Sequence, residues 1–292
     1  GIRGRGNTTW MNPKKPYRLK FDSSTELLGM PANRHWVLLA NYKDVTLLRN
    51  ELAFHFAWNI GMEYAPRNQQ VDVYLNNDYL GIYQLTEHLR VGKNRVNIDE
   101  MEVDDVSGDA LTGGYLMEMD FRMAKDYCVG NAGGVGCTSE INTERETTFC
   151  VDSRYGMQPI CLDNPEDLLE PEWQAQREYI ETYLTDMEDA LFSEHFDEQE
   201  GYAKYLNIES VIHYYLVNEL FHNVDGAVAS FWMYKKRNDK LFFGPIWDFD
   251  LTLGNRTDGK GNVYDAWHIR QSSWFERFFE DPLFDDAFKN QW

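Results

Sequence analysis

Alternation of hydrophobic and polar residues in the first third of the chain predicts β-strands. In residues 17–21, apolar side chains alternate with Arg18 and Lys20, so the two basic residues share the opposite face of the strand. Residues 71–75 and 80–85 form a second alternating pair, joined by a run of Asn and Asp residues of the kind found in tight turns. These segments predict an antiparallel sheet in the N-terminal part of the protein.

Helical periodicity is found once in this first part and twice further along the chain. Apolar residues recur at helical spacing in residues 46–60, and Gly61 is placed to end that helix. In residues 172–192 one face carries the apolar side chains, whereas residues 208–221 are strongly apolar, which indicates a buried helix. The pattern therefore predicts a mainly helical C-terminal part.

Two acidic motifs flank a predicted hairpin in this C-terminal part. The loop after the helix predicted at residues 208–221 contains Asp225. Two strands are expected next, at residues 231–235 and 241–247, and Asp248 and Asp250 follow the second strand. Because a hairpin brings its two ends together, we expect Asp225 and Asp248 to face one cavity. Acids at the ends of apolar elements repel each other unless a cation, a base or a hydrogen-bond donor offsets their charge.

Paired acids of this kind suit three different chemistries. In phosphoryl transfer, one Asp orients or deprotonates the acceptor hydroxyl while another holds Mg²⁺ against the phosphates. In glycoside hydrolysis, two carboxylates flank the scissile bond. The acids could also bind a structural Ca²⁺, which prefers hard oxygen ligands.

The basic N-terminal segment distinguishes between these chemistries. Arg3, Arg5 and Lys20 lie close in sequence to the glycines Gly4 and Gly6. Glycines let backbone amides approach a phosphate, and Arg or Lys neutralises its charge. A glycoside hydrolase has no general need for such a segment, so its combination with the downstream acids favours a nucleotide site.

The overall charge of the chain excludes other partners. With 48 acidic and 28 basic residues, the formal net charge is −20. Such a surface repels phosphate backbones, which argues against nucleic-acid binding. No segment approaches the roughly 18 to 20 apolar residues that a membrane span needs.

All the cysteines lie in one segment, residues 122–165, which follows a strand predicted at 114–119 and which we expect to be an inserted loop. They are Cys128, Cys137, Cys150 and Cys161. No CxxC pair or histidine at zinc-like spacing is present, so a zinc site is not expected. Two disulfides in one of three pairings are the expected arrangement and indicate an oxidising compartment, with free cytosolic thiols as the alternative.

These segments predict one α+β domain over residues 1–292. Its expected parts are a strand-rich N-terminal part (1–121), the disulfide-stapled insertion (122–165) and a mainly helical part with the acidic hairpin (166–292). Because the chain starts without Met inside a candidate motif, we expect it to be a fragment of a longer chain.

Several short motifs occur in a defined order over nearly the whole chain. They are residues 2–7, 13–21, 75–87, 223–225 and 244–250, followed by Gly254. Together they resemble the CotH kinase family, named after spore coat protein H. The resemblance implies an atypical protein-kinase-like fold with two lobes that uses ATP and a divalent metal, Mg²⁺ or Mn²⁺.

The resemblance also implies roles for the acidic residues. Asp225 corresponds to the catalytic aspartate and Asp248 to the metal-binding aspartate, and Asp250 belongs to the same motif as a second candidate metal ligand. Ser230 stands where many members have an Asn. A hydroxyl is a poorer metal ligand than an amide oxygen, so we expect weaker binding of a second metal or slower turnover.

The basic residues are implied to bind the nucleotide. Lys20 resembles the phosphate-contacting lysine, with Glu87 as its candidate acidic partner and Glu51 as the competing one. Arg3 and Arg5 complete the expected set of cofactor-binding residues.

The function that follows is transfer of the γ-phosphoryl group of ATP to Ser or Thr hydroxyls of secreted or surface proteins. The expected location is extracytoplasmic: periplasmic, cell-surface or secreted. A non-catalytic CotH-like binding protein, an adhesin or pseudokinase, is the main alternative, and it would not need to retain the acids. A polysaccharide-acting hydrolase is the third, and it predicts an aromatic-lined groove.

Overall fold

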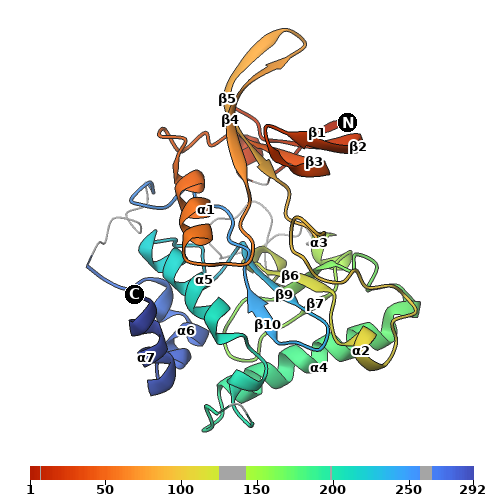
Figure 1. Ribbon diagram of the computed structural model, residues 1–292, viewed down its shortest axis with the longest axis vertical. Coiled ribbons are helices and arrows are strands. Elements are labelled where there is room, and N and C mark those ends of the chain that lie inside the picture. Colours follow the sequence, from red (N-terminus) through yellow and green to blue (C-terminus); the bar gives the residue numbers. More distant parts are fainter. Residues whose placement is uncertain (7, 125–142, 198, 257–264) are drawn as a thin grey trace, which may run out of the picture.

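The chain folds around two antiparallel sheets. The computed structural model describes residues 1–6, 8–124, 143–197, 199–256 and 265–292. Within these residues the N-terminal sheet has the strand order β1-β2-β3-β5-β4, and the second sheet has the order β10-β9-β6-β8-β7. In Figure 1 the N-terminal sheet lies above the second sheet, and the β4–β5 hairpin projects from the top. The α+β class is confirmed.

The N-terminal sheet confirms the alternation read from the sequence. Its strands are β1 (Ile2–Gly4), β2 (Tyr17–Leu27), β3 (Met30–Leu39), β4 (Asn68–Leu75) and β5 (Asp78–Glu87). Tyr17, Leu19 and Phe21 pack on a hydrophobic cluster that contains Trp36 and Leu85. Strand β3 was not predicted from the sequence.

The turn between β4 and β5 has the expected chemistry. Asn76 and Asn77 have φ angles of 51° and 72°, in the left-handed region that Asn tolerates better than most residues. Two such residues in succession make the type I′ turn that matches the twist of a hairpin. The predicted hairpin is confirmed, and its strands are longer than expected.

The second sheet corrects two expectations. Its strands are β6 (Tyr115–Met119), β7 (Cys150–Val151), β8 (Ile160–Asn164), β9 (Phe231–Lys235) and β10 (Leu241–Phe243). Strand β8 pairs with β6 inside the sheet, so residues 122–165 are not only an inserted loop; the buried Ile160 and Leu162 belong to the core. Strand β10 ends at Phe243, because Gly244 has a φ of 117° and Pro245 has no N–H for the ladder.

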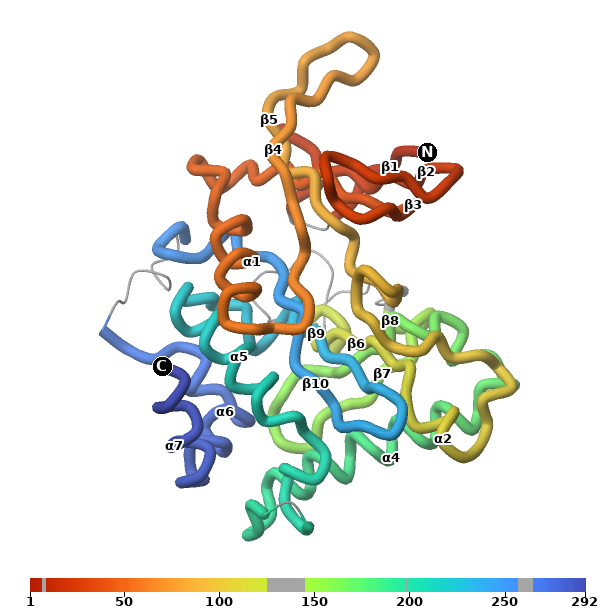
Figure 2. Tube along the Cα trace, in the orientation of Figure 1, coloured from red at the N-terminus to blue at the C-terminus, as the bar shows by residue number. Residues whose placement is uncertain are grey.

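The helices cover the second sheet (Figure 2). They are α1 (Arg49–Asn59), α2 (Gly108–Leu111), α3 (Thr143–Glu146), α4 (Gln174–Leu191), α5 (Ile208–Leu220), α6 (Ser273–Phe278) and α7 (Pro282–Gln291). Short 3₁₀ helices lie at Thr8–Met11, Phe121–Met123, Pro171–Trp173, Tyr202–Lys204 and Ile269–Gln271. Helix α5 is buried along most of its length, as expected, and Gly61 (φ 94°) follows the end of α1.

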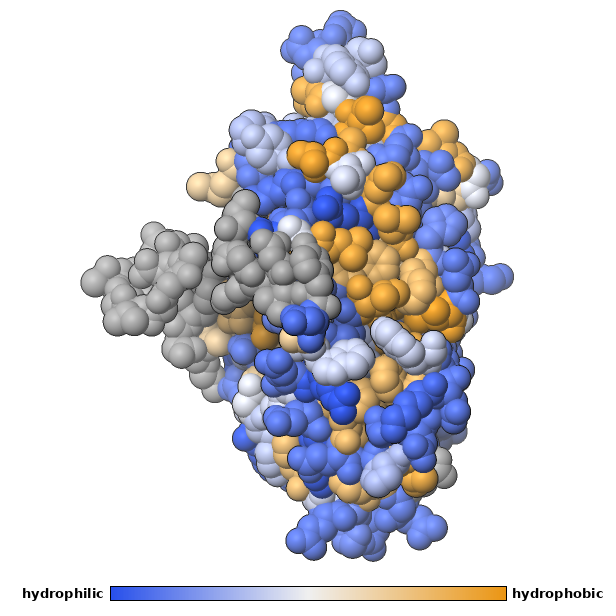
Figure 3. Space-filling view, turned by 90° about the vertical axis from the view of Figure 1, so that its left-hand side faces the viewer, coloured by the Kyte–Doolittle hydropathy of each residue, from blue (hydrophilic) through white to orange (hydrophobic). Residues whose placement is uncertain are grey.

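The hydrophobic side chains form two separate clusters. The larger one joins the second sheet to the helices, and the smaller one lies on one face of the N-terminal sheet. Figure 3 shows the side of the molecule that is on the left in Figure 1, where hydrophobic residues gather over the middle of the surface. Among the residues that the structure describes, no helix has the length and apolar character needed to span a bilayer.

One disulfide joins neighbouring strands of the second sheet. It links Cys150 on β7 to Cys161 on β8, which are paired across the strands. This is one of the pairings that the sequence left open. Cys128 and Cys137 lie outside the described residues.

Candidate active site

A cavity of about 280 Å³ lies where the N-terminal segment meets α1, the second sheet and the chain after β10. We call it the central cavity. The side chains that line it include the basic Arg5, Lys14 and Arg122, the acidic Glu118, Asp248 and Asp250, and the hydroxyl of Ser230. Residues more than 200 positions apart in the sequence therefore share one site.

Asp248 and Asp250 bring two carboxylates to the central cavity. Asp248 has a φ of 68°, and its side chain is exposed on the wall of the central cavity. Burial raises the pKa of Asp248, and the charge of Asp225 raises it further, whereas Arg5 opposes the shift. Asp250 is only 9% exposed, and burial together with the charge of Asp248 raises its pKa to about 7. The two acids destabilise each other's ionised form, so a cation between them would be bound favourably.

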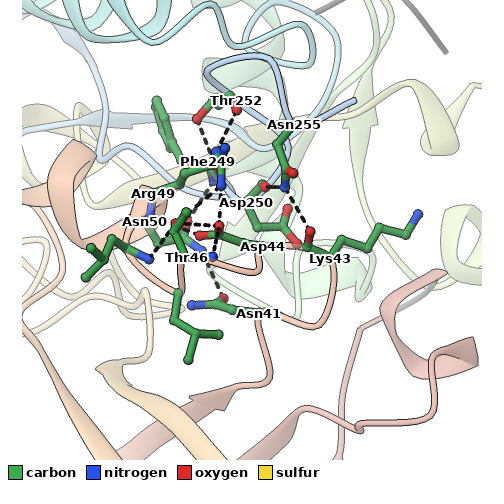
Figure 4. A network of polar contacts seen from close by, with 12 residues as sticks. Asn41, Lys43, Asp44, Thr46, Arg49, Asn50, Phe249, Asp250, Thr252 and Asn255 are labelled. Atoms are coloured by element: carbon green, nitrogen blue, oxygen red, sulfur yellow. Dashed lines mark hydrogen bonds and ion pairs between the residues drawn. The ribbon is translucent and has the colours of Figure 1, made fainter. Parts of the chain in front are cut away.

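A chain of side-chain amides holds the backbone between these two acids (Figure 4). The Phe249 N–H donates to Asn50 Oδ1 at 2.7 Å, and Asn50 Nδ2 donates to Asn41 Oδ1 at 3.1 Å. Asn41 Nδ2 then donates to Gln84 Oε1 on β5 at 2.8 Å. The amides thus connect the acidic loop to α1 and to the N-terminal sheet.

A second set of contacts fixes the start of α1 against the same loop (Figure 4). Asp44 is buried, accepts a hydrogen bond from the Arg49 N–H at 3.0 Å and forms an ion pair with the Arg49 guanidinium. Arg49 Nε in turn donates to the carbonyl of Thr252 at 2.9 Å. Asn255 Nδ2 donates to the backbone carbonyl of Asp250. Both ends of the acidic loop are therefore tied down.

Arg5 is the predicted phosphate-binding residue that reaches the central cavity. Its guanidinium lies over the Trp247 ring, 5.4 Å from the ring centroid. Burial lowers the pKa of Arg5, and the charges of Asp248 and Glu118 oppose that shift. Gly6, which also lines the cavity, has a φ of 81°, and a Cβ placed on it would lie 2.1 Å from Thr9 Oγ1. This turn requires glycine.

Arg3 and Lys20 lie on the N-terminal sheet and do not line the central cavity. Arg3 pairs with Arg18 across β1 and β2, and Lys20 pairs with His35 across β2 and β3. Directly paired residues point to the same side, so these four side chains form a basic face opposite the hydrophobic cluster. The lysine that lines the cavity is Lys14, which the sequence did not single out.

The structure does not pair Lys20 with either expected acid. Glu87 is fully buried and forms ion pairs with Arg95 at 2.5 Å and Arg67 at 3.1 Å. Glu51 accepts a hydrogen bond from Gln70 Nε2 at 3.3 Å. Glu87 thus pairs with two arginines in the structure, and its role with the nucleotide stays a prediction.

Asp225 lies near the central cavity but does not line it. Its carboxylate forms an ion pair with Arg256 at 3.1 Å, and its N–H donates to Asn223 Oδ1 at 3.2 Å. Its charge is the strongest of those that raise the pKa of Asp248, so the expected proximity of the two acids is supported. Ser230 lines the cavity, is 8% exposed and has a φ of 51°.

Glu118 and Arg122 are cavity residues that the sequence reasoning missed. Glu118 lies on β6, where burial and the charge of Asp120 raise its pKa to about 8. Arg122 forms an ion pair with Asp120. An acid inside the apolar strand at residues 114–119 was the available signal, because an ionisable group in such a strand needs a chemical reason.

The donor set fits a divalent cation that is shared with a phosphate. In the described parts of the chain, no three His, Cys, Asp or Glu side chains gather as a preformed metal site. Mg²⁺ is usually held by one or two carboxylates together with substrate phosphates and water, and Asp248 and Asp250 can supply that number. The residues present therefore suit a metal bound with a nucleotide.

Comparison with known proteins identifies the family of the chain. A search of curated proteins found no match. The family model described as CotH kinase protein matches residues 2–292, which is nearly the whole chain. The chain therefore belongs to the CotH kinase family.

Proposed function

We propose that this protein is an ATP- and divalent-metal-dependent protein kinase that phosphorylates Ser or Thr hydroxyls. One observation carries the proposal: Asp248 and Asp250 share a cavity with Arg5. Carboxylates for a metal and a guanidinium for a phosphate are the groups that phosphoryl transfer requires. Membership of the CotH family supports kinase-like function at the level of the family.

In this proposal the two sheets belong to the two lobes of an atypical kinase. Two features support it: each sheet has its own hydrophobic cluster, and the central cavity is lined from both sides. The nucleotide enters between Arg5 in the N-terminal segment and Asp248 after β10.

The residues act by binding and orientation. When bound, Mg²⁺ or Mn²⁺ would neutralise negative charge on the phosphates of ATP. Asp248 and Asp250 hold the cation, and Arg5 donates to a phosphate oxygen. Asp225 accepts a hydrogen bond from the Ser or Thr hydroxyl of the substrate and aligns that hydroxyl for in-line attack. For this, Asp225 must give up its ion pair with Arg256 when the substrate binds.

We further propose an extracytoplasmic location. The Cys150–Cys161 disulfide is compatible with an oxidising compartment. The substrates are accordingly secreted or surface proteins with accessible Ser or Thr residues.

The test is transfer of label from ATP to the protein itself and to serine-containing peptides, with Mg²⁺ or Mn²⁺. Asp248→Ala and Asp225→Ala should each reduce transfer by about 100-fold or more, because each removes a group that acts in the transition state. Asp72→Asn, on the projecting hairpin, is the matched control and should transfer label like the wild type.

Calorimetry of ATP binding separates the alternatives. Equal label in all variants, or absence of nucleotide binding by the wild type, would overturn the kinase proposal. Binding of ATP without transfer would instead favour the non-catalytic form of the fold.

A further inference from the structure

Glu118 faces the central cavity from the floor of the second sheet. It pairs with Trp232 across β6 and β9, and both residues line the cavity. Directly paired residues on antiparallel strands point to the same side of the sheet, so the register agrees with this placement. The proposed kinase mechanism gives Glu118 no role.

The Glu118 carboxylate has no partner in the described residues. It accepts no hydrogen bond there, and no cation among them lies within ion-pair distance of it. Arg122, whose charge acts on Glu118, forms an ion pair with Asp120. A carboxylate inside a protein is unfavourable without compensation, so this placement calls for a ligand.

Asp250 points independently to the same kind of ligand. It is nine-tenths buried, lines the same cavity, and its carboxylate makes no hydrogen bond or ion pair to the described residues. The charges of Asp248 and Glu118 act on Arg5, but no hydrogen bond or ion pair joins Arg5 to either carboxylate. Arg122, the other guanidinium that lines the cavity, forms an ion pair with Asp120, so neither arginine forms an ion pair with any of the three cavity acids Glu118, Asp248 and Asp250.

The residue at position 230 gives a reason for an additional metal ligand at Glu118. Ser230 lines the cavity next to the start of β9, and β9 pairs with β6, the strand that carries Glu118. A neutral hydroxyl is a weak ligand for a hard cation, whereas a carboxylate is a strong one. Glu118 therefore offers, from the neighbouring strand, the oxygen ligand that Ser230 supplies poorly.

We propose that Glu118 is a ligand of a divalent cation in the central cavity, where it compensates for Ser230. The inference rests on the proposed function, because the cation is the one that accompanies the nucleotide. Because Glu118, Asp248 and Asp250 do not gather as a preformed three-acid site in the described residues, the phosphates of the nucleotide and water would complete the coordination between β6 and the acids that follow β10.

The test is Mn²⁺ binding, measured by calorimetry and by electron paramagnetic resonance, with and without ADP so that no turnover occurs. Glu118→Gln should lower the Mn²⁺ affinity by about 10-fold or more, and Glu118→Asp should recover part of it. Asp72→Asn, which removes an acid from the projecting β4–β5 hairpin, is the control and should bind Mn²⁺ like the wild type.

Thermal unfolding distinguishes a ligand from a structural residue. Without metal, Glu118→Gln should unfold at the same temperature as the wild type or higher, because the Glu118 carboxyl group makes no hydrogen bond or ion pair to the described residues that the change would remove. The increase in Tm that Mn²⁺ and ADP give the wild type should shrink in this variant. A lower Tm without metal, with Mn²⁺ binding retained, would show a structural role and overturn the inference.

The outcomes separate this inference from the kinase proposal. Mn²⁺ binding that depends on Glu118 in a protein without transferase activity would sustain the inference and reject the kinase. Transferase activity in the wild type, together with normal Mn²⁺ binding by Glu118→Gln, would support the kinase proposal and reject the role of Glu118 as a ligand. Failure of the wild type to bind Mn²⁺ would reject both.

Discussion

Asn50 accepts a hydrogen bond from the Phe249 N–H at 2.7 Å, across 199 positions of sequence. The contact holds the one residue that separates Asp248 from Asp250. Helix α1 and the amide chain to β5 therefore help to set where the two carboxylates point. The candidate site depends on this contact as much as on the acids themselves.

Replacing Asn50 by Leu should loosen the acidic loop. The buried Phe249 N–H would lose its acceptor, which should lower the free energy of unfolding by about 1–3 kcal/mol. Mn²⁺ affinity should fall as well, because the two carboxylates would no longer be oriented together. Urea denaturation and calorimetry measure these effects. Asn59→Leu, at an exposed position of α1, is the control; equal effects from both changes would contradict the assigned role.

Gly6→Ala should destabilise the protein more than Gly29→Ala does. Both glycines have nearly the same φ, 81° and 78°, so alanine meets a similar backbone cost of about 1–2 kcal/mol at each. A Cβ at Gly29 meets no atom within 4 Å, whereas one at Gly6 meets Thr9 Oγ1. We expect Gly6→Ala to lose at least about 1 kcal/mol more, by chemical denaturation, and to bind ATP more weakly. Equal losses would mean that Thr9 moves aside.

Glu87→Gln should affect stability first. It would leave the buried Arg95 without its counter-charge, which typically costs about 3–5 kcal/mol. Glu51→Gln, which removes the competing candidate partner of Lys20, should have a small effect on unfolding. A Glu87→Gln protein of normal stability that no longer transfers phosphate would instead support the nucleotide-site role predicted for Glu87.

Acidification should destabilise the fold through His88. Burial and the charge of Arg18 lower the pKa of His88 from its ordinary value of 6.5 to about 3. Between these pH values the unfolded chain binds a proton that the folded protein does not, so stability falls as the pH falls from about 6.5 toward 3.

His88→Gln removes this proton and should flatten the fall. The difference in slope between the two proteins should stay below about 1.4 kcal/mol per pH unit, the limit for one group. Denaturation midpoints between pH 7 and 4 measure it, and His55→Gln controls for the loss of an exposed histidine on α1. An identical slope with and without His88 would show that another group is responsible.

Local patterns predicted local structure well. The alternation at residues 17–21 placed the apolar side chains on the hydrophobic cluster, and the Asn pair predicted the β4–β5 turn, because both depend on neighbouring residues. Strand β8 was missed because it lies in a segment without clear periodicity, and pairing with β6 decides its conformation.

The acidic centre was predictable in part. Asp248 and Asp250 stood out as acids directly after apolar residues, and the hairpin gave a reason for Asp225 to lie near them. The sequence by itself therefore determined the α+β class, the strand faces and the candidate acids, since these follow from residue type and short-range spacing. Only the tertiary structure decided that Arg5 and Glu118 share the cavity while Arg3, Lys20 and Glu87 do not, because contacts between distant segments depend on how the two sheets pack.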